Sequence, residues 1–133
     1  MGQYLIDNNV ISHFLSRQFS PESMEFIGEI IDNTPNISII TKIESLAWVT
    51  SDKNKERIIA DFVEYSNIFE LTPPIVNLCI KIKRNRKIKT PDAIIAATAI
   101  CNNLTLITSD KDFTNISDLK VLNPNRIDVN DKD

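Results

Sequence analysis

Residues 90–113 read Thr-Pro-Asp-Ala-Ile-Ile-Ala-Ala-Thr-Ala-Ile-Cys-Asn-Asn-Leu-Thr-Leu-Ile-Thr-Ser-Asp-Lys-Asp-Phe, and this stretch decides the fold. Thr90-Pro91-Asp92 begins a strongly apolar helix, with Thr90 as N-cap and Pro91 as first helical residue. We expect the helix to end near Cys101, because Asn102-Asn103 can supply the left-handed residue that terminates a helix. Residues 104–107 then form an apolar strand. A helix followed directly by a buried strand is typical of a βαβ chain with a mostly parallel sheet.

Short apolar strands and amphipathic helices alternate along the rest of the chain as well. We expect four further strands, at residues 4–6, 37–40, 68–71 and 119–122. We expect the other helices at residues 10–15, 21–31 and 55–65, from residue 41 onward, and from residue 73 into a basic segment. These elements predict one α/β domain over residues 1–126, with three layers (α/β/α) around a mostly parallel five-stranded sheet, and a polar tail at 127–133.

The composition of the 133 residues fits an ordinary globular domain and excludes several kinds of site. With 42% hydrophobic and 25% charged residues, the chain is neither disordered nor fibrous. The single histidine, His13, excludes chemistry that needs two imidazoles, and with only Cys79 and Cys101 beside it the usual zinc sites cannot be completed. The two glycines, Gly2 and Gly28, cannot build the glycine-rich loops that bind dinucleotides or nucleoside triphosphates.

The N-terminus and the apolar runs indicate a cytoplasmic protein without a membrane anchor. Residues 1–7 contain no basic region and no long apolar stretch, so they do not resemble a signal peptide. The longest apolar run, residues 93–101, is far shorter than the ~20 residues that span a bilayer.

Cations are concentrated in residues 81–89, which read Lys-Ile-Lys-Arg-Asn-Arg-Lys-Ile-Lys and contain no acid. The net charge of the whole chain is −3, so this segment is a basic region on an acidic protein. Such a region indicates either a polyanionic partner bound at one place or a solvated helix end whose cations favour the helix dipole. The residues alone leave both interpretations open.

Four carboxylates fall where the predicted elements meet one edge of the sheet. Asp7 ends the first strand and Asp110 follows the fourth. Glu44 follows the second strand, and Asp92 lies in the first turn of the helix that leads into the fourth. Parallel sheets bind ligands outside the carboxyl ends of their strands, so we expect these acids to converge.

Each of the four acids also has a purely structural interpretation. Glu44 can be the acid of a capping box begun by Thr41, and Asp92 can be an acid favoured by the helix dipole. Asp7 and Asp110 can be caps or Asx-turns. Capping, however, does not favour one edge of a sheet.

Clustered acids of this kind indicate a metal site. Four carboxylates within a few ångströms repel one another, and their pKa values rise unless a cation is present. Oxygen ligands without His or Cys favour Mg²⁺ or Mn²⁺, and such ions serve phosphoryl chemistry.

The order of these motifs resembles the PIN-domain ribonucleases, and most of all the small VapC-type toxins of toxin–antitoxin pairs. The shared pattern is an apolar strand ending in Asp7-Asn8-Asn9, then Glu44, then Thr90-Pro91-Asp92-Ala93-x-x-Ala96-Ala97-x-Ala99, then Leu106-Ile107-Thr108-Ser109-Asp110-Lys111-Asp112-Phe113. The last two motifs are the most specific. The resemblance covers essentially the whole chain and implies a sheet of strand order 3-2-1-4-5.

The resemblance also implies a set of site residues. The catalytic acids and metal ligands would be Asp7, Glu44, Asp92 and Asp110, with Asp112 as a second candidate in the last motif. Asn9 matches a position that orients the first acid, and Thr108 matches a polar residue beside the site. The chain departs from the family at Asn8, where Thr or Ser is usual, and this removes a hydroxyl contact but leaves the carboxylates intact.

The implied function is a Mg²⁺- or Mn²⁺-dependent endoribonuclease, the toxin of a type II toxin–antitoxin system. It would hydrolyse RNA with metal-activated water and leave 5′-phosphate and 3′-hydroxyl ends. The basic segment would hold the RNA backbone through Lys81, Lys83, Arg84, Arg86, Lys87 and Lys89. A cognate antitoxin and a second copy of the chain, forming a homodimer, would dock on the helices between residues 21 and 65. Phe14, Phe19, Phe26 and Trp48 are anchors for these partners or simply core residues, and we expect His13 to be structural.

Two other functions remain as alternatives. A phosphotransfer receiver domain also has an acidic Mg²⁺ pocket, but it needs paired acids after the first strand and an acceptor Asp after the third. This chain has Asp7 alone after the first strand and Glu70-Leu71-Thr72 at the end of the third. A non-catalytic binding module with the same fold is the other alternative, and the presence of all four acids argues against it.

Overall fold

The structure is a computed structural model of the chain and describes residues 3–126. The expected tail at 127–133 lies outside the described residues, so the domain boundary at residue 126 stays a prediction. Among residues 3–126, we find no helix with the length and apolar character that crossing a bilayer requires.

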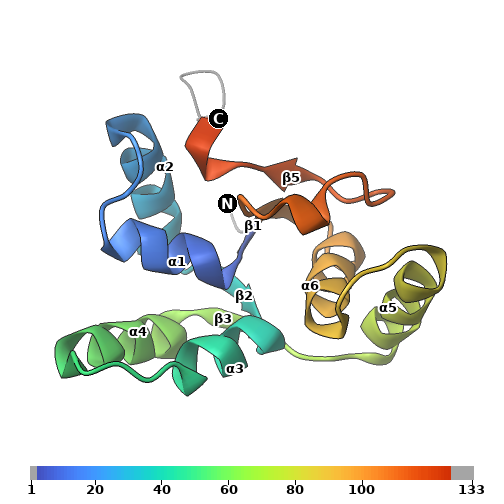
Figure 1. The fold of residues 1–133 in the computed structure, drawn as a ribbon, viewed down its shortest axis with the longest axis horizontal. Helices are drawn as coiled ribbons and strands as arrows, with labels where there is room; N and C mark the ends of the chain where they lie inside the picture. Colours follow the sequence, from blue (N-terminus) through green and yellow to red (C-terminus); the bar gives the residue numbers. More distant parts are fainter. Residues whose placement is uncertain (1–2, 127–133) are drawn as a thin grey trace.

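A five-stranded sheet forms the centre of the molecule, and each pair of neighbouring strands is parallel. The strand order is β3-β2-β1-β4-β5, which confirms the predicted order. The strands are short: β1 (Tyr4–Ile6), β2 (Asn36–Ser38), β3 (Asn67–Phe69), β4 (Thr105–Ile107) and β5 (Val121–Leu122). With β1 and β4 adjacent at its centre, the sheet brings the residues that follow these two strands side by side (Figure 1).

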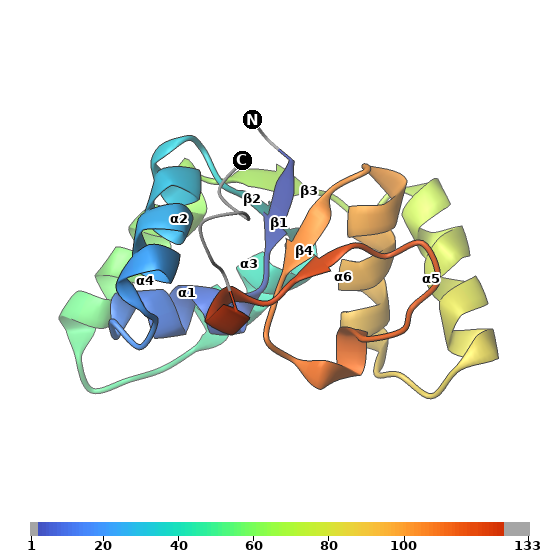
Figure 2. The same cartoon turned by 90° about the horizontal axis from the view of Figure 1, so that it is seen from above.

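Helices cover both faces of the sheet and complete the predicted three-layer α/β/α fold (Figure 2). On one side lie α1 (Asn8–Leu15), α2 (Pro21–Asp32) and α4 (Lys53–Tyr65), and on the other lie α5 (Pro73–Asn85) and α6 (Thr90–Cys101). Helix α3 (Ile39–Ala47) follows β2, a short 3₁₀ turn η1 (Lys111–Phe113) follows β4, and a second, η2 (Pro124–Arg126), follows β5.

Alternating side chains of β1 and β4 separate the core into two hydrophobic clusters. Leu5 and Leu106 pack into the cluster beneath α5 and α6, whereas Ile6 and Ile107 pack into the cluster beneath α1, α2 and α4. All four are at most 1% exposed. This two-residue period is what a strand buried on both faces requires, and it fixes the register of the two central strands.

Helix α6 is buried almost all round. Its inner residues are mostly small: Ala93, Ala96, Ala97 and Ala99 are all 0% exposed. These small side chains let α6 lie close to the sheet and to α5, and Ile95 fills part of the cluster between them. The helix therefore holds its N-terminal residues, Asp92 among them, in a fixed place relative to the central strands.

Several helix starts and strand ends differ from the predictions by one or two residues. Helices α1 and α4 begin at Asn8 and Lys53, two residues before the predicted starts at 10 and 55. Strand β3 ends at Phe69 instead of residue 71, and β5 begins at Val121 instead of residue 119.

The second strand was predicted to run to Ile40, but it ends at Ser38, whose Oγ accepts a hydrogen bond from the Thr41 N–H at 3.0 Å and caps α3. The β-branched Ile39 and Ile40 favour a strand locally, and the cap overrides them. Helix α6 is capped at Lys89, with no side-chain cap bond, so the predicted N-cap at Thr90 is wrong by one residue. At its other end the prediction is confirmed, because Asn103 has φ = 54° in the left-handed region.

Candidate active site

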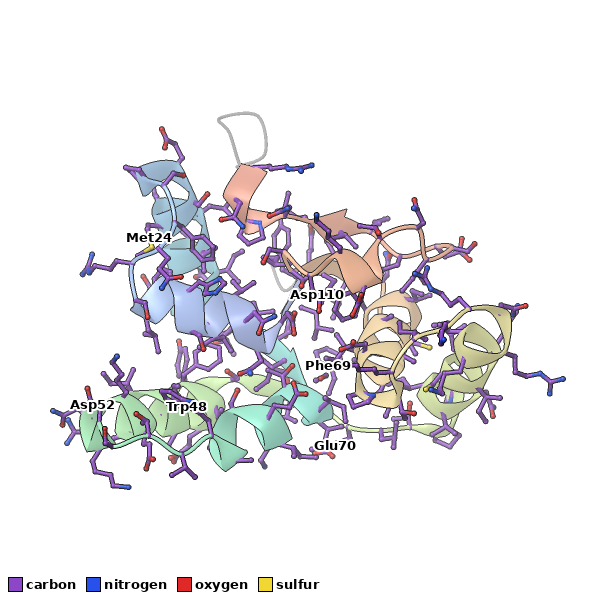
Figure 3. The ribbon with its side chains drawn as sticks, viewed as in Figure 1. Met24, Trp48, Asp52, Phe69, Glu70 and Asp110 are labelled. Carbon is purple, nitrogen blue, oxygen red and sulfur yellow. The ribbon has the colours of Figure 1, made fainter. Side chains whose placement is uncertain are left out.

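A cavity of about 520 Å³ opens at the carboxyl edge of the sheet, between α1, α3, α6 and η1. Carboxylates from separate parts of the chain line it: Asp7, Glu44, Asp92, Asp110 and Asp112. Figure 3 shows Asp110 beside η1, facing the region between α1 and α6. The predicted convergence of the acids is therefore observed, because β1 and β4 end side by side and α3 and α6 begin at the same edge.

Asp7 is the most enclosed of these acids, with 5% of its surface exposed. It caps α1, where its Oδ1 accepts a hydrogen bond from the Asn8 N–H at 2.8 Å. Its Oδ2 accepts a second hydrogen bond, at 2.7 Å, from the hydroxyl of Thr108. Burial raises the pKa of Asp7, the hydrogen bonds from Thr108 and Asn8 lower it in part, and the negative charge of Asp110 raises it further.

Thr108 links the first and last acidic motifs. Its side chain is 1% exposed, and its Oγ both donates to Asp7 and accepts a hydrogen bond from the Asp110 N–H at 3.1 Å. Asp110 in turn accepts a bond from the Asp112 N–H through its own Oδ1, at 2.9 Å. One chain of hydrogen bonds thus runs from Asp7 to Asp112 and fixes the loop after β4.

Three of the acids approach closely enough to share one metal ion. Asp92, Asp110 and Asp112 each offer a carboxylate oxygen, and these oxygens all lie within 4.8 Å of one another. Burial raises the pKa of Asp92, and the charges of Asp110, Asp7 and Asp112 raise it further, while Lys89 lowers it. An all-oxygen, strongly anionic donor set fits a hard divalent cation such as Mg²⁺ or Mn²⁺.

Glu44 reaches the same cavity from α3. Burial raises its pKa, and the charges of Asp7 and Asp92 raise it further, which places Glu44 within electrostatic reach of both. The capping-box interpretation of Glu44 is wrong, since Ser38 rather than Thr41 is the N-cap of α3. Glu44 lies six positions beyond that cap, too far along the helix to bond back to it.

None of the cavity's acids is neutralised by a salt bridge with Lys or Arg within residues 3–126, where the one ion pair is Lys53–Glu56. Lys89 is the single cation among the residues that line the cavity. Acids that merely stabilise a fold are commonly spaced apart or paired with a base, whereas these repel one another at some cost to stability. Such an arrangement is typical of a site that a cation completes.

Asn8 of the first motif also lines the cavity, together with residues that the sequence did not place there: Ser12, Ser45 and Trp48. Ser45 donates a hydrogen bond from its Oγ to Asn8 Oδ1 at 2.7 Å, which ties α3 to the start of α1. The amide oxygen of Asn8, the residue at which the chain departs from the expected motif, thus accepts this bond. Asn9 also lines the cavity, but the hydrogen bonds to Asp7 come from Asn8 and Thr108.

The cations of the basic segment are exposed or, in the case of Arg86, half-buried, and two of them make hydrogen bonds within the protein. Lys83 donates a hydrogen bond to the Ile88 carbonyl at 2.9 Å, and Arg86 donates to the carbonyls of Thr114 and Asp112. The other four cations of the segment are exposed and form no ion pair within residues 3–126: Lys81, Arg84, Lys87 and Lys89. Two of the six predicted RNA contacts thus have hydrogen-bond partners inside the protein.

The aromatic residues separate in a similar way. Phe19 and Phe26 are buried in the core, and Phe14 packs against it. His13 packs edge-on against Phe19 with ring centres 5.8 Å apart, as expected of a structural residue. Trp48, in contrast, is 45% exposed, at the end of α3.

Comparison with known proteins agrees with this architecture. The PIN domain family matches residues 4–119, which is most of the chain. No curated protein matches it. Among solved structures, FitAcB from Neisseria gonorrhoeae is 26% identical, with a TM-score of 0.76 over 93% of this chain and 99% of that one.

Two further solved structures have similar folds. A toxin–antitoxin complex from Klebsiella pneumoniae contains a chain 27% identical, with a TM-score of 0.69 over 93% of this chain and 99% of that one. The VapBC2 complex from Rickettsia felis, bound to a DNA fragment from its promoter, contains a chain 21% identical, with a TM-score of 0.73 over 90% of this chain and 96% of that one. The family match, the strand order and the acidic cavity agree with one another, and the chain therefore belongs to the PIN domain family.

Proposed function

We propose that this chain is a Mg²⁺- or Mn²⁺-dependent endoribonuclease and the toxin of a type II toxin–antitoxin pair. The observation that carries the proposal is the convergence of unpaired carboxylates in one open cavity. Asp92, Asp110 and Asp112 would hold the ion, with Asp7 and Glu44 directed at the same space. A bound divalent ion supplies a nucleophilic water at neutral pH and offsets charge on the transferring phosphate.

The chain's own residues prepare the site in three ways. Asp7 is held rigidly by Asn8 and Thr108, so its carboxylate keeps one orientation. Glu44, whose pKa is raised by burial and by its acidic neighbours, is suited to position or deprotonate the attacking water. The cavity is open, so a flexible single strand can reach the acids from solvent.

The exposed cations of the basic segment would bind the phosphate backbone of the RNA substrate next to the acids. Lys89 lines the cavity, and Lys81, Arg84 and Lys87 continue from it toward the end of α5. A polyanion laid along these cations would pass the acids at the N-terminus of α6. Contacts of this kind read the phosphate backbone and not the sequence, so we expect binding to depend strongly on salt.

The proposed partners follow from the relatives. The similar solved structures include toxin–antitoxin complexes, and an antitoxin that covers the acidic cavity would be expected to offer it a basic side chain. The exposed side chains at the end of α3, among them Ile43, Leu46 and Trp48, provide apolar area for such a partner or for a second copy of the chain. We expect the protein to act in the cytoplasm, where both RNA and the antitoxin are present.

RNA cleavage by the purified chain tests the proposal. Wild type is expected to cut RNA with Mn²⁺ or Mg²⁺ and to stop when EDTA is added. Asp7→Asn and Asp92→Asn each remove one charge at constant shape and should lose activity, by on the order of a hundredfold or more. Asp61→Asn, which changes an exposed acid of α4, is the matched control and should cleave like wild type. Equal cleavage by all four proteins would refute the nuclease and favour a non-catalytic module.

A further inference from the structure

Arg86 lies in the basic segment but is placed differently from its neighbours. It is the C-cap residue of α5, with an extended backbone (φ −161°, ψ 163°), and its side chain crosses to the loop after β4. There Nη1 donates a hydrogen bond to the Thr114 carbonyl at 3.1 Å, and Nη2 donates a longer one to the Asp112 carbonyl at 3.4 Å. The two residues joined in this way are 26 and 28 positions along the chain from Arg86.

The guanidinium is held in place at its base as well as at its tip. Its Nε is buried and has no hydrogen-bond partner in the part of the chain that the structure describes. Burial of an unpaired N–H costs free energy. Because Nε stays buried in spite of this cost, the other contacts of the side chain must outweigh it. The side chain is therefore part of the packing between α5 and the loop and is not a free arm for a phosphate.

The loop that Arg86 contacts carries two of the three clustered acids. Its own hydrogen bonds are local: Asp112 N–H to Asp110 Oδ1, Phe113 N–H to the Asp110 carbonyl, and Thr114 N–H to the Lys111 carbonyl. Phe113 is 1% exposed and anchors the middle of the loop in the core. Arg86 adds one contact on each side of Phe113, at the carbonyls of Asp112 and Thr114, and it joins the loop to the connection that leads into α6 and Asp92.

We propose that Arg86 is a positioning residue: its fork of two N–H groups braces the Asp110–Thr114 loop against the end of α5 and so sets the spacing of Asp110 and Asp112 relative to Asp92. The consequence for metal binding rests on the proposed function. A guanidinium can bridge two carbonyls in a fixed plane, whereas an ammonium acts as a point donor, so Lys should not replace it.

The sign of the effect separates bracing from simple electrostatics. The Arg86 charge lies beside the Asp112 carbonyl, so by charge alone it repels a divalent cation bound by this loop. Removing it would then tighten metal binding. Bracing predicts the opposite, because an acid that is free to move pays an ordering cost when the ion binds.

The experiment measures loop exchange and Mn²⁺ affinity separately. Hydrogen–deuterium exchange of the metal-free protein follows the amides of residues 110–114, and electron paramagnetic resonance of free Mn²⁺ gives the affinity. For Arg86→Met we expect faster exchange in that loop and on the order of tenfold weaker Mn²⁺ binding. Arg86→Lys should show the same two changes in part. Arg57→Met, which removes an exposed cation of α4, is the matched control and should match wild type in both.

Three results would overturn the proposal: unchanged loop exchange in Arg86→Met, Mn²⁺ affinity that is unchanged or higher, or full wild-type behaviour in Arg86→Lys. If Arg86→Met does not fold, loop exchange and Mn²⁺ affinity of Arg86→Lys decide the test. A wild-type protein that binds no Mn²⁺ would refute the metal-dependent function and with it the proposed role in metal binding. Loop exchange in the metal-free variants would still decide whether Arg86 braces the loop.

Discussion

Asp92→Asn should stabilise the metal-free protein and destabilise it relative to wild type once metal is present. The Asp92, Asp110 and Asp112 oxygens lie within 4.8 Å of one another, a separation at which two unit charges repel by about 0.9 kcal/mol in bulk water and more in a less polar medium. Asp92 faces two such partners, so the gross relief is about 2 kcal/mol, which salt screening reduces. Loss of a carboxylate in the first turn of α6 costs about 0.5 kcal/mol of helix-dipole stabilisation.

The expected net gain in EDTA is about 1 kcal/mol, equivalent to a rise of roughly 3 to 5 °C in Tm for a domain of this size. With Mn²⁺ at about a hundred times its Kd, wild type should instead gain about 2.7 kcal/mol that the variant lacks. The order of the two Tm values should therefore reverse between EDTA and Mn²⁺.

Thermal unfolding at roughly pH 8, where the acids are ionised, checks both halves of this prediction. Asp61→Asn serves as the control, because the same chemical change in α4 should leave Tm within about 1 °C of wild type in either buffer. A variant less stable than wild type in EDTA would show that Asp92 is not under repulsion. Wild type with the same Tm in EDTA and Mn²⁺ would show that the acids bind no ion.

Three further predictions follow from the site. The pKa values of Asp7, Glu44 and Asp92 are raised above the ordinary 3.8 and 4.5, so the metal-free protein should lose stability as pH rises from the ordinary pKa of these acids through their raised pKa. Stabilisation by Mn²⁺ should fade on acidification at a higher pH than ordinary carboxylates imply. A Tm series from neutral to acid pH, with and without Mn²⁺, measures both trends, and a metal effect that persists down to the ordinary pKa would contradict them. Thr108→Val removes the hydroxyl bond to buried Asp7 and should lower the free energy of unfolding in urea by about 2 to 3 kcal/mol, whereas Thr105→Val at the start of β4 should lower it by under about 1 kcal/mol. Equal losses in the two variants would show that Thr108 does not link the first and last acidic motifs. In the Asp92→Asn background, replacing Lys81, Arg84 and Lys87 by Gln should reduce the slope of log binding constant for RNA against log salt concentration by about 2. The same change of Lys53, Lys55 and Arg57 should leave the slope unaltered. An equal reduction in both variants would assign RNA binding to net charge alone.

Sequence reasoning predicted best those features that depend on local chemistry. Helix α6 ends as predicted because Asn103 adopts a left-handed conformation, and the sheet follows from apolar strands that alternate with helices. The end of β2 was misplaced because Ile39 and Ile40 favour a strand by themselves, and only the bond from Thr41 N–H to Ser38 shows that the helix has already begun. Propensity and capping compete at that point, and the sequence does not show which is stronger.

The candidate site was predictable as a set of acids but not as a geometry. Strand ends and helix starts indicated that Asp7, Glu44, Asp92 and Asp110 share an edge, yet the tightest group includes Asp112. That grouping depends on the turn after β4, whose shape is set by the hydrogen bonds that Thr108 Oγ and Asp110 Oδ1 accept from the N–H groups of Asp110 and Asp112. Contacts between remote segments, such as Asn8 with Ser45, were not predicted because they arise only when α1 and α3 pack together.

The hydrogen bond between Thr108 and Asp7 joins residues 101 positions apart. Closing so long a stretch of chain costs conformational entropy, so we expect the central pairing of β1 with β4 to form after contacts between nearer segments. During translation the first acid would leave the ribosome long before the last, and the cavity would have no complete set of carboxylates in the meantime. If the chain is the ribonuclease toxin proposed above, an unfinished chain would not cleave nearby RNA, and the cell would have until the end of synthesis to supply the proposed antitoxin.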